Sequence, residues 1–123
     1  MTARTQALGR YGEDAAARHL AAAGLTVLER NWRCRAGELD IVALDGDTLA
    51  VCEVKTRTAN GFQSPTEAVD ATKSARLALL AERWLAERWP GPPPPGGLRI
   101  DLVCVVHGHR GPAQVSHLPG AVG

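Results

Sequence analysis

The chain has 123 residues, 45% of them hydrophobic, which is enough to bury one core and too few for two ordinary domains, so we expect a single domain over residues 1–123. With 14 basic and 13 acidic side chains, the net charge of +1 points to neither a nucleic-acid nor a membrane partner. The cysteines Cys34, Cys52 and Cys104 lack metal-finger or redox spacing, so we expect reduced thiols in the cytoplasm. No apolar run approaches the ~20 residues of a membrane-spanning helix.

Apolar positions recur at helical spacing from Thr5 to Ala23, which predicts a first helix, and Gly24 offers a left-handed stop. Gly9 and Gly12 lie inside this helix, where each costs roughly 1 kcal/mol relative to alanine. We therefore expect the sheet to approach the helix closely at both glycines.

Residues 25–33 (LTVLERNWR) are rich in the branched and aromatic residues typical of a strand, and residues 38–56 predict two more strands. A two-residue turn at Gly46 and Asp47 joins these two strands and pairs Asp45 with Thr48. The same register places Asp40 opposite Glu53 and Glu38 opposite Lys55. It also pairs Ile41 with Cys52 and collects the charged side chains on one face.

The second half of the chain predicts another helix and two strands. SPTEAV (64–69) has the pattern of a capped helix start, and the helix breaks near Asp70, restarts, and continues to about Trp89. The proline-rich stretch 90–97 ends it as a surface connector. Residues 98–106 (LRIDLVCVV) predict a strand buried on both faces, and AQVSHL a final edge strand. This order indicates an α/β fold with a mixed sheet and helices packed on it.

Directly opposed residues have Cβ atoms roughly 4.5 to 5.5 Å apart, so two carboxylates at such positions repel each other. The repulsion raises the pKa of one carboxylate unless a cation binds between them. Mg²⁺ or Mn²⁺ accepts carboxylate oxygens, so Asp40 and Glu53 are predicted metal ligands. Lys55 could position or deprotonate a water on the metal, and such a group of side chains can hydrolyse a phosphodiester. The alternative remains that these charges form the solvated face of a hairpin, with Glu38 and Lys55 as an ordinary ion pair.

Asp40, twelve residues, and then Glu53-Val54-Lys55 resemble the acid-spacer-acid-any-lysine signature of restriction-endonuclease-like nucleases. A wider set resembles the YraN-like family, which is similar to archaeal Holliday junction resolvases: YGEDAAARHL, GLTVLERNWRCRAGELDIVA, VCEVKTR, SPTEAV followed by Lys73, and RIDLV. The resemblance runs from about Leu8 to Val106. It implies a restriction-endonuclease-like α/β/α core, with Asp40, Glu53 and Glu13 as metal ligands and Lys55 as the catalytic lysine. The proline that often precedes the first acid is Leu39 here, and Gln63 stands where we expect glycine.

Four further cations are candidates for phosphate contacts: Arg33 and Arg35 before the acidic hairpin, Arg57 after it, and Lys73 in the second helix. The alternative for each of the four is that it lies on the surface and contacts no phosphate. For Lys73 we favour this alternative, with its side chain solvated in the first turn of the helix. Asp101, inside an apolar strand, is expected to need a buried partner such as Arg99 or backbone donors.

These observations favour a Mg²⁺- or Mn²⁺-dependent DNA endonuclease that prefers branched DNA. The alternative is a nucleic-acid-binding module of the same fold with little or no catalysis. Symmetric cutting of two strands would call for a homodimer with paired sites.

Overall fold

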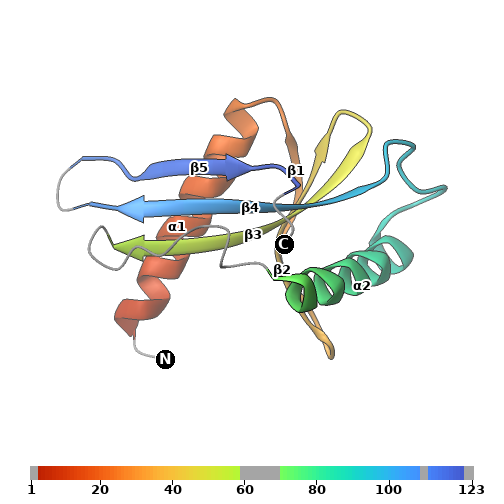
Figure 1. Cartoon of the computed structure of the whole chain (residues 1–123), viewed down its shortest axis with the longest axis horizontal. Helices are drawn as coiled ribbons and strands as arrows, with labels where there is room; N and C mark the ends of the chain where they lie inside the picture. The colour runs from red at the N-terminus through yellow and green to blue at the C-terminus, as the bar shows by residue number, and fades with distance from the viewer. Residues whose placement is uncertain (1–2, 59–69, 109–110, 121–123) are drawn as a thin grey trace.

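The computed structural model describes residues 3–58, 70–108 and 111–120. Its elements are α1 (Ala3–Ala22), β1 (Thr26–Cys34), β2 (Gly37–Asp45), β3 (Thr48–Thr58), α2 (Ala71–Arg88), β4 (Leu98–His107) and β5 (Gln114–Leu118). They form one mixed sheet in the order β1-β2-β3-β4-β5, in which β3 and β4 are parallel and the other neighbours antiparallel (Figure 1). This architecture confirms the predicted α/β class and is compatible with a restriction-endonuclease-like core. Neither helix in the described ranges is long and apolar enough to cross a membrane.

The two helices cover opposite faces of the sheet. Successive strand residues point to opposite faces, and in β3 Val51 packs with the α2 cluster whereas Ala50 and Cys52 pack with the α1 cluster. The α2 cluster includes Val42, Leu49, Leu77, Leu80, Trp84 and Ile100. The α1 cluster includes Ala16, Leu20, Ile41, Ala43, Val103 and Val105. The hairpin face that carries Asp40 and Glu53 is therefore covered by α2, and the alternative of a freely solvated face is wrong.

The β2–β3 hairpin has the predicted register. Asp45 pairs with Thr48 across the turn, Gly46 has a φ of 62°, and Ile41 pairs with Cys52. The expectation that Glu38 faces Lys55 is wrong. Glu38 pairs instead with Arg33 of β1, whose Nε donates to Glu38 Oε2 at 2.8 Å. The physical reason is that β2 leaves β3 beyond Ile41 while it remains paired with β1 as far as Gly37.

Helix α1 lies close to β3 at Gly12. A Cβ on Gly12 would overlap Thr56 Oγ1 and lie 2.8 Å from Thr56 Cβ, so the close approach predicted there is confirmed. The same expectation is wrong for Gly9, where an added Cβ would meet nothing within 4 Å. After the helix, Gly24 has a φ of 99°, as its predicted stop requires.

Helix α2 begins after Asp70, whose Oδ1 accepts a hydrogen bond from Lys73 N at 2.8 Å. This cap confirms the predicted restart near Asp70, while the start predicted at 64–69 and the departure at Gln63 lie outside the described residues. The connector that follows is mostly exposed, as predicted, and ends on the β2–β3 turn. Gly96 N donates to Asp47 O, and Leu49 N donates to Gly97 O, each at 2.8 Å.

Candidate functional site

Asp40 lies where β2 separates from β3. The paired residues of these strands end at Ile41 and Cys52, while β3 continues beside β4 as far as Thr58. Beyond that point the Asp40 carboxylate replaces a neighbouring strand, because its Oδ2 accepts a hydrogen bond from Val54 N at 2.8 Å. The divergence opens the sheet at this position, and the hydrogen bond fixes the carboxylate in the opening.

Two hollows meet at Asp40, which lines both. The Glu13 hollow, of about 380 Å³, is lined by Leu8, Gly9, Glu13, Asp40, Val54, Lys55, Thr56 and Arg57. The acidic hollow, of about 230 Å³, is lined by Gly37, Glu38, Asp40, Glu53, Lys73, Arg76, Leu77 and Leu80. The fold thus brings the four predicted site residues together from α1, β2 and β3, and their chemical roles remain predictions.

The electrostatics at Asp40 are those of a crowded carboxylate. Burial raises the pKa of Asp40 to about 8, helped by hydrogen bonding and repulsion from Glu53, while the Val54 amide acts in the opposite direction. The Glu53 side chain is only 13% exposed. A proton relieves this repulsion at neutral pH, and a bound cation would do the same.

The Glu13 carboxylate is hydrogen-bonded to Asn31 of β1. Asn31, whose amide orientation is assigned by its hydrogen bonding, donates to both Glu13 oxygens at 3.1 and 2.9 Å. Asn31 has a φ of 55°, a left-handed conformation that asparagine tolerates better than most residues. Burial raises the pKa of Glu13, and Arg30 and Asn31 partly offset the rise. Sequence reasoning did not single out Asn31, because its approach to α1 depends on the packing of β1.

Both lysines of the chain lie at the site. Lys55 was predicted to act there, whereas Lys73 was a candidate phosphate contact for which a solvated first turn was favoured. Lys73 Nζ lies 3.0 Å from Glu53 Oε2, and its side chain is only 24% exposed, so the favoured solvated position is wrong. The two lysines contact each other. Burial and the contact with Lys73 lower the pKa of Lys55; burial also opposes charge on Lys73, but Lys55 and Glu53 outweigh it and raise the Lys73 pKa. The scarcity of lysine in an arginine-rich chain was the available sequence signal.

The three arginines predicted to contact phosphates occupy different surroundings. Arg57 lines the Glu13 hollow, and its Nη1 donates to Thr56 O at 3.0 Å. Arg33 is paired with Glu38 but its side chain remains 78% exposed. Arg35 is exposed in the turn between β1 and β2. Their contacts with nucleic acid stay predictions.

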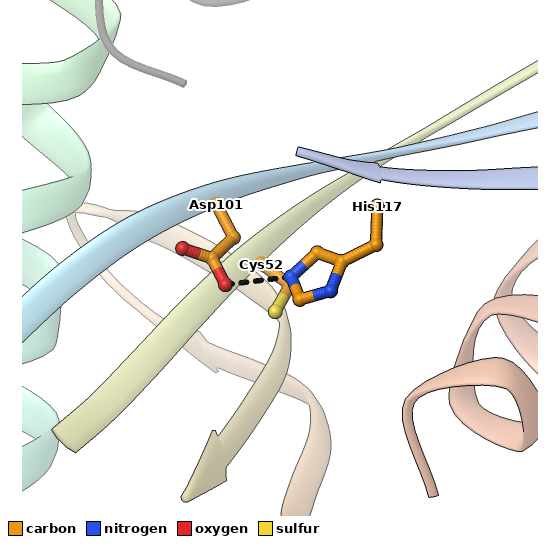
Figure 2. A group of neighbouring side chains, drawn as sticks. All are labelled: Cys52, Asp101 and His117. Atoms are coloured by element: carbon orange, nitrogen blue, oxygen red, sulfur yellow. Dashed lines mark hydrogen bonds and ion pairs between the residues drawn. The ribbon is translucent and has the colours of Figure 1, made fainter. Parts of the chain in front are cut away.

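A second group of potential metal ligands was not predicted as a set. Within residues 3–58, 70–108 and 111–120, the ligand atoms of Cys52, Asp101 and His117 all lie within 4.8 Å of one another (Figure 2). The residues come from β3, β4 and β5, which are neighbours in the sheet. The carboxylates of Glu13, Asp40 and Glu53 are spread over two adjoining hollows and do not form so tight a group.

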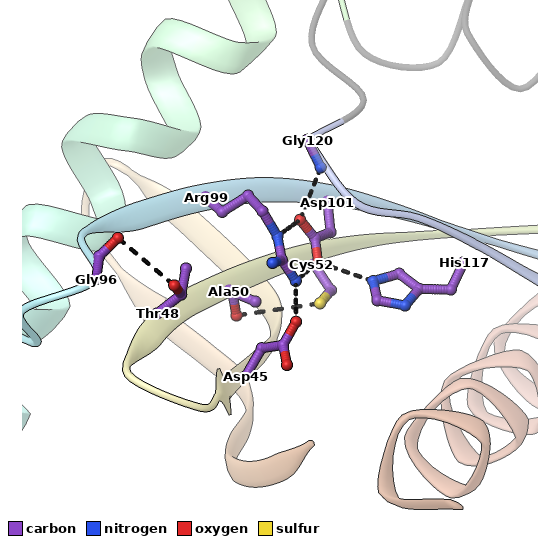
Figure 3. A network of polar contacts seen from close by, with 9 residues as sticks. All are labelled: Asp45, Thr48, Ala50, Cys52, Gly96, Arg99, Asp101, His117 and Gly120. Atoms are coloured by element: carbon purple, nitrogen blue, oxygen red, sulfur yellow. Dashed lines mark hydrogen bonds and ion pairs between the residues drawn. The ribbon is translucent and has the colours of Figure 1, made fainter. Parts of the chain in front are cut away.

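Hydrogen bonds already satisfy the Asp101 carboxylate, which is fully buried. Arg99 donates to it from Nε at 2.7 Å and from Nη2 at 2.9 Å, and Gly120 N donates at 3.0 Å (Figure 3). His117 Nε2 lies 2.8 Å from Oδ2. Burial raises the pKa of the Cys52 thiol to about 12, so the thiol stays protonated at neutral pH. These contacts confirm the predicted partners of Asp101, and they show a hydrogen-bonded network whose atoms could also serve as metal ligands.

Comparison with known proteins places the chain in a family. A family model described as uncharacterised protein family UPF0102 matches residues 12–105, which include all four predicted catalytic residues. The chain is 60% identical over 114 residues to a UPF0102 protein of Streptomyces griseus, a match that covers 93% of this chain and 94% of the relative. It is 54% identical over 115 residues to one of Frankia alni (94% and 93%) and 47% identical over 123 residues to one of Acidothermus cellulolyticus (94% and 93%).

Proposed function

The chain belongs to the uncharacterised protein family UPF0102, and we propose that it is a Mg²⁺- or Mn²⁺-dependent endonuclease that hydrolyses DNA phosphodiester bonds. One observation carries the proposal. The Asp40 and Glu53 carboxylates are held together in a partly buried hollow, with Lys55 beside them, and burial and repulsion raise the pKa of Asp40 to about 8. A divalent cation is the ligand that would let both carboxylates ionise. The resemblance of this trio to the restriction-endonuclease-like signature supports the same conclusion.

The donor set fits a hard cation. Asp40 and Glu53 would hold it through carboxylate oxygens with waters in the remaining positions, as Mg²⁺ prefers, and Glu13 adds a third carboxylate from the adjoining hollow. When bound, the cation would neutralise charge on a phosphate and acidify a bound water.

The two lysines have different tasks. Lys55 lines the hollow beside Asp40, so it is placed to orient or deprotonate the attacking water, and burial and the contact with Lys73 lower its pKa. Lys73 orients the Glu53 carboxylate through their ion pair at 3.0 Å. Arg57, at the rim of the Glu13 hollow, is placed to hold a neighbouring phosphate.

The test is cleavage of end-labelled duplex, single-stranded, flap and four-way-junction DNA with Mg²⁺ or Mn²⁺. We expect metal-dependent cleavage that Glu53→Gln reduces at least ~100-fold, since the variant removes a metal-ligand charge. Glu82→Gln, an exposed substitution on α2, is the matched control and should cleave like the wild type. Activity that survives Glu53→Gln, or that needs no metal, would exclude this site.

A second candidate function is a nucleic-acid-binding module without catalysis. It is favoured by the present partners of the two carboxylates: Asp40 Oδ2 accepts from Val54 N, and Glu53 Oε2 pairs with Lys73. These contacts occupy oxygens that a metal would use. Salt-sensitive binding of DNA without cleavage under any metal condition would favour this function over the endonuclease.

Location and assembly complete the proposal. We place the protein in the cytoplasm, where Cys34, Cys52 and Cys104, all free thiols in the structure, stay reduced. Symmetric cutting of a branched DNA would require a homodimer, which sedimentation with and without a four-way junction would detect.

A further inference from the structure

A third hollow continues from the acidic hollow along α2. We call it the arginine hollow; it measures about 290 Å³ and is lined by Ala36, Arg76, Leu79, Leu80 and Arg83. Arg76 and Leu80 line the acidic hollow as well, so the two are contiguous. A strand bound in one hollow would therefore lie next to the other.

The arginine hollow carries positive charge. Its charged lining residues are Arg76 and Arg83, both exposed, and no carboxylate of the described residues lines it. Arg83 Nη1 lies 3.8 Å from Cys34 Sγ, which places that guanidinium against the turn between β1 and β2, where Arg35 is exposed. Figure 1 shows α2 beside this end of the sheet. The hollow thus has a polarity opposite to that of the carboxylates next to it.

An apolar side chain stands between the two arginines. Leu79 is 68% exposed, more than the other exposed large hydrophobic residues of the described chain, Leu28 and Leu98. Arg76 and Arg83 are seven residues apart, about 10 Å along a helix, so their guanidinium groups can reach different phosphates of one strand. Two such cations with an apolar surface between them suit a strand whose bases are unstacked, because stacked duplex bases offer no free face to a leucine.

We propose that the arginine hollow holds an unpaired DNA strand whose neighbouring phosphate enters the acidic hollow. Arg76 and Arg83 bind two backbone phosphates of this strand, and Leu79 contacts a base or sugar between them. This inference rests on the proposed function and deepens it, because it makes an unpaired arm the feature of branched DNA that the protein recognises.

The test is fluorescence anisotropy with labelled single-stranded and duplex oligonucleotides in EDTA over a range of salt concentrations. For Arg76→Gln/Arg83→Gln we expect single-strand affinity to fall about tenfold near 50 mM salt, and the slope of log affinity against log salt to become shallower by about 1.4, because each single-strand phosphate contact contributes about 0.7. Duplex affinity should change less than about threefold. The matched control Arg18→Gln/Arg88→Gln removes two exposed arginines elsewhere and should bind like the wild type.

Leu79→Ser is a second variant that the fold should tolerate, since the side chain is mostly exposed. It should weaken single-strand binding about threefold with an unchanged salt slope, since it removes an apolar contact and no charge. Unchanged single-strand binding in both variants would overturn the inference, and equal losses on duplex would reassign the hollow to paired DNA.

The outcomes also separate this inference from the proposed function. If the wild type cleaves DNA while the hollow variants bind and cleave normally, the inference fails and the endonuclease stands. If the wild type neither binds nor cleaves any oligonucleotide at low salt, both fail. Polyglutamate that competes as well as a single strand would show that the hollow accepts any acidic polymer, which also overturns the assignment.

Discussion

Asp40 has two tasks at the residue level that work against each other. Its Oδ2 accepts the Val54 amide, which stabilises the end of the hairpin, yet its position beside Glu53 makes its charge unfavourable. A fold that needed the hydrogen bond alone could use asparagine at this position. An ionisable carboxyl group at this crowded position supports the proposed metal site, because a bound cation would favour its charged form.

The first prediction concerns Asp40→Asn and pH. Because the pKa of Asp40 is raised to about 8 in the folded state, against about 4 when unfolded, the folded protein binds more protons between these values. The stabilisation of the folded state by protonated Asp40 is complete below about pH 4 and is lost as the pH rises through about 8. Over this range the free energy of unfolding falls by up to about 1.4 kcal/mol per pH unit. We expect wild type in EDTA to lose stability from pH 5 to 8.5, and Asp40→Asn to lose much less.

Thermal unfolding measured across this range with EDTA or with Mn²⁺ checks the prediction. Mn²⁺ should raise the melting temperature of the wild type at pH 8 and leave Asp40→Asn nearly unchanged, because the variant lacks a ligand charge. Glu82→Gln should follow the wild type in both buffers. Parallel pH profiles for wild type and Asp40→Asn would show that Asp40 ionises freely.

Lys73 shows why single residues were harder to assign than elements. In the sequence it is the third residue of a helix, a position that is usually solvated, and eighteen positions after Lys55. Its contact with Glu53 requires the whole of α2 to lie over the β2–β3 face, which local pattern does not specify. His117 and Asn31 were missed for the same reason.

The element-level prediction concerns the contact between α1 and β3. Gly12→Ala adds a methyl group that overlaps Thr56, so helix and strand must separate, and we expect a loss of about 1 to 3 kcal/mol in the free energy of unfolding. Urea denaturation monitored by circular dichroism measures it. Gly9→Ala is the control, because its Cβ meets nothing and the better helix propensity should add stability, by up to about 1 kcal/mol. Equal stability of the two variants would mean that α1 is not held against Thr56.

At the scale of the molecule, the Asp101 network joins segments that are distant in sequence. Arg99 bridges Asp101 to Asp45 at the β2–β3 turn, at 2.9 Å, while His117 and Gly120 bring in β5 and the residues after it (Figure 3). A buried carboxylate with this many donors stabilises the fold provided that all its partners are present.

We therefore expect Asp101→Asn to destabilise the whole domain by about 3 to 5 kcal/mol, since it leaves Arg99 with only the half-exposed Asp45 as a counter-charge. Chemical denaturation measures the loss, and Glu87→Gln, an exposed change on α2, should cost little. A small effect of Asp101→Asn, together with a rise in melting temperature on adding Zn²⁺ that Cys52→Ala abolishes, would instead assign the trio to a metal site.

The sequence by itself determined the elements, their order and the hairpin register, because these follow from local periodicity, from glycine and proline, and from a two-residue turn. It also indicated which carboxylates the register brings together. The tertiary structure decided what those carboxylates meet: β2 leaves β3 beyond Ile41, Glu38 turns to Arg33, α2 brings Lys73 to Glu53, and β5 brings His117 to Asp101. The reason is physical, since a register is set by neighbours along two strands, whereas burial and long-range ion pairs depend on how whole elements pack across the sheet.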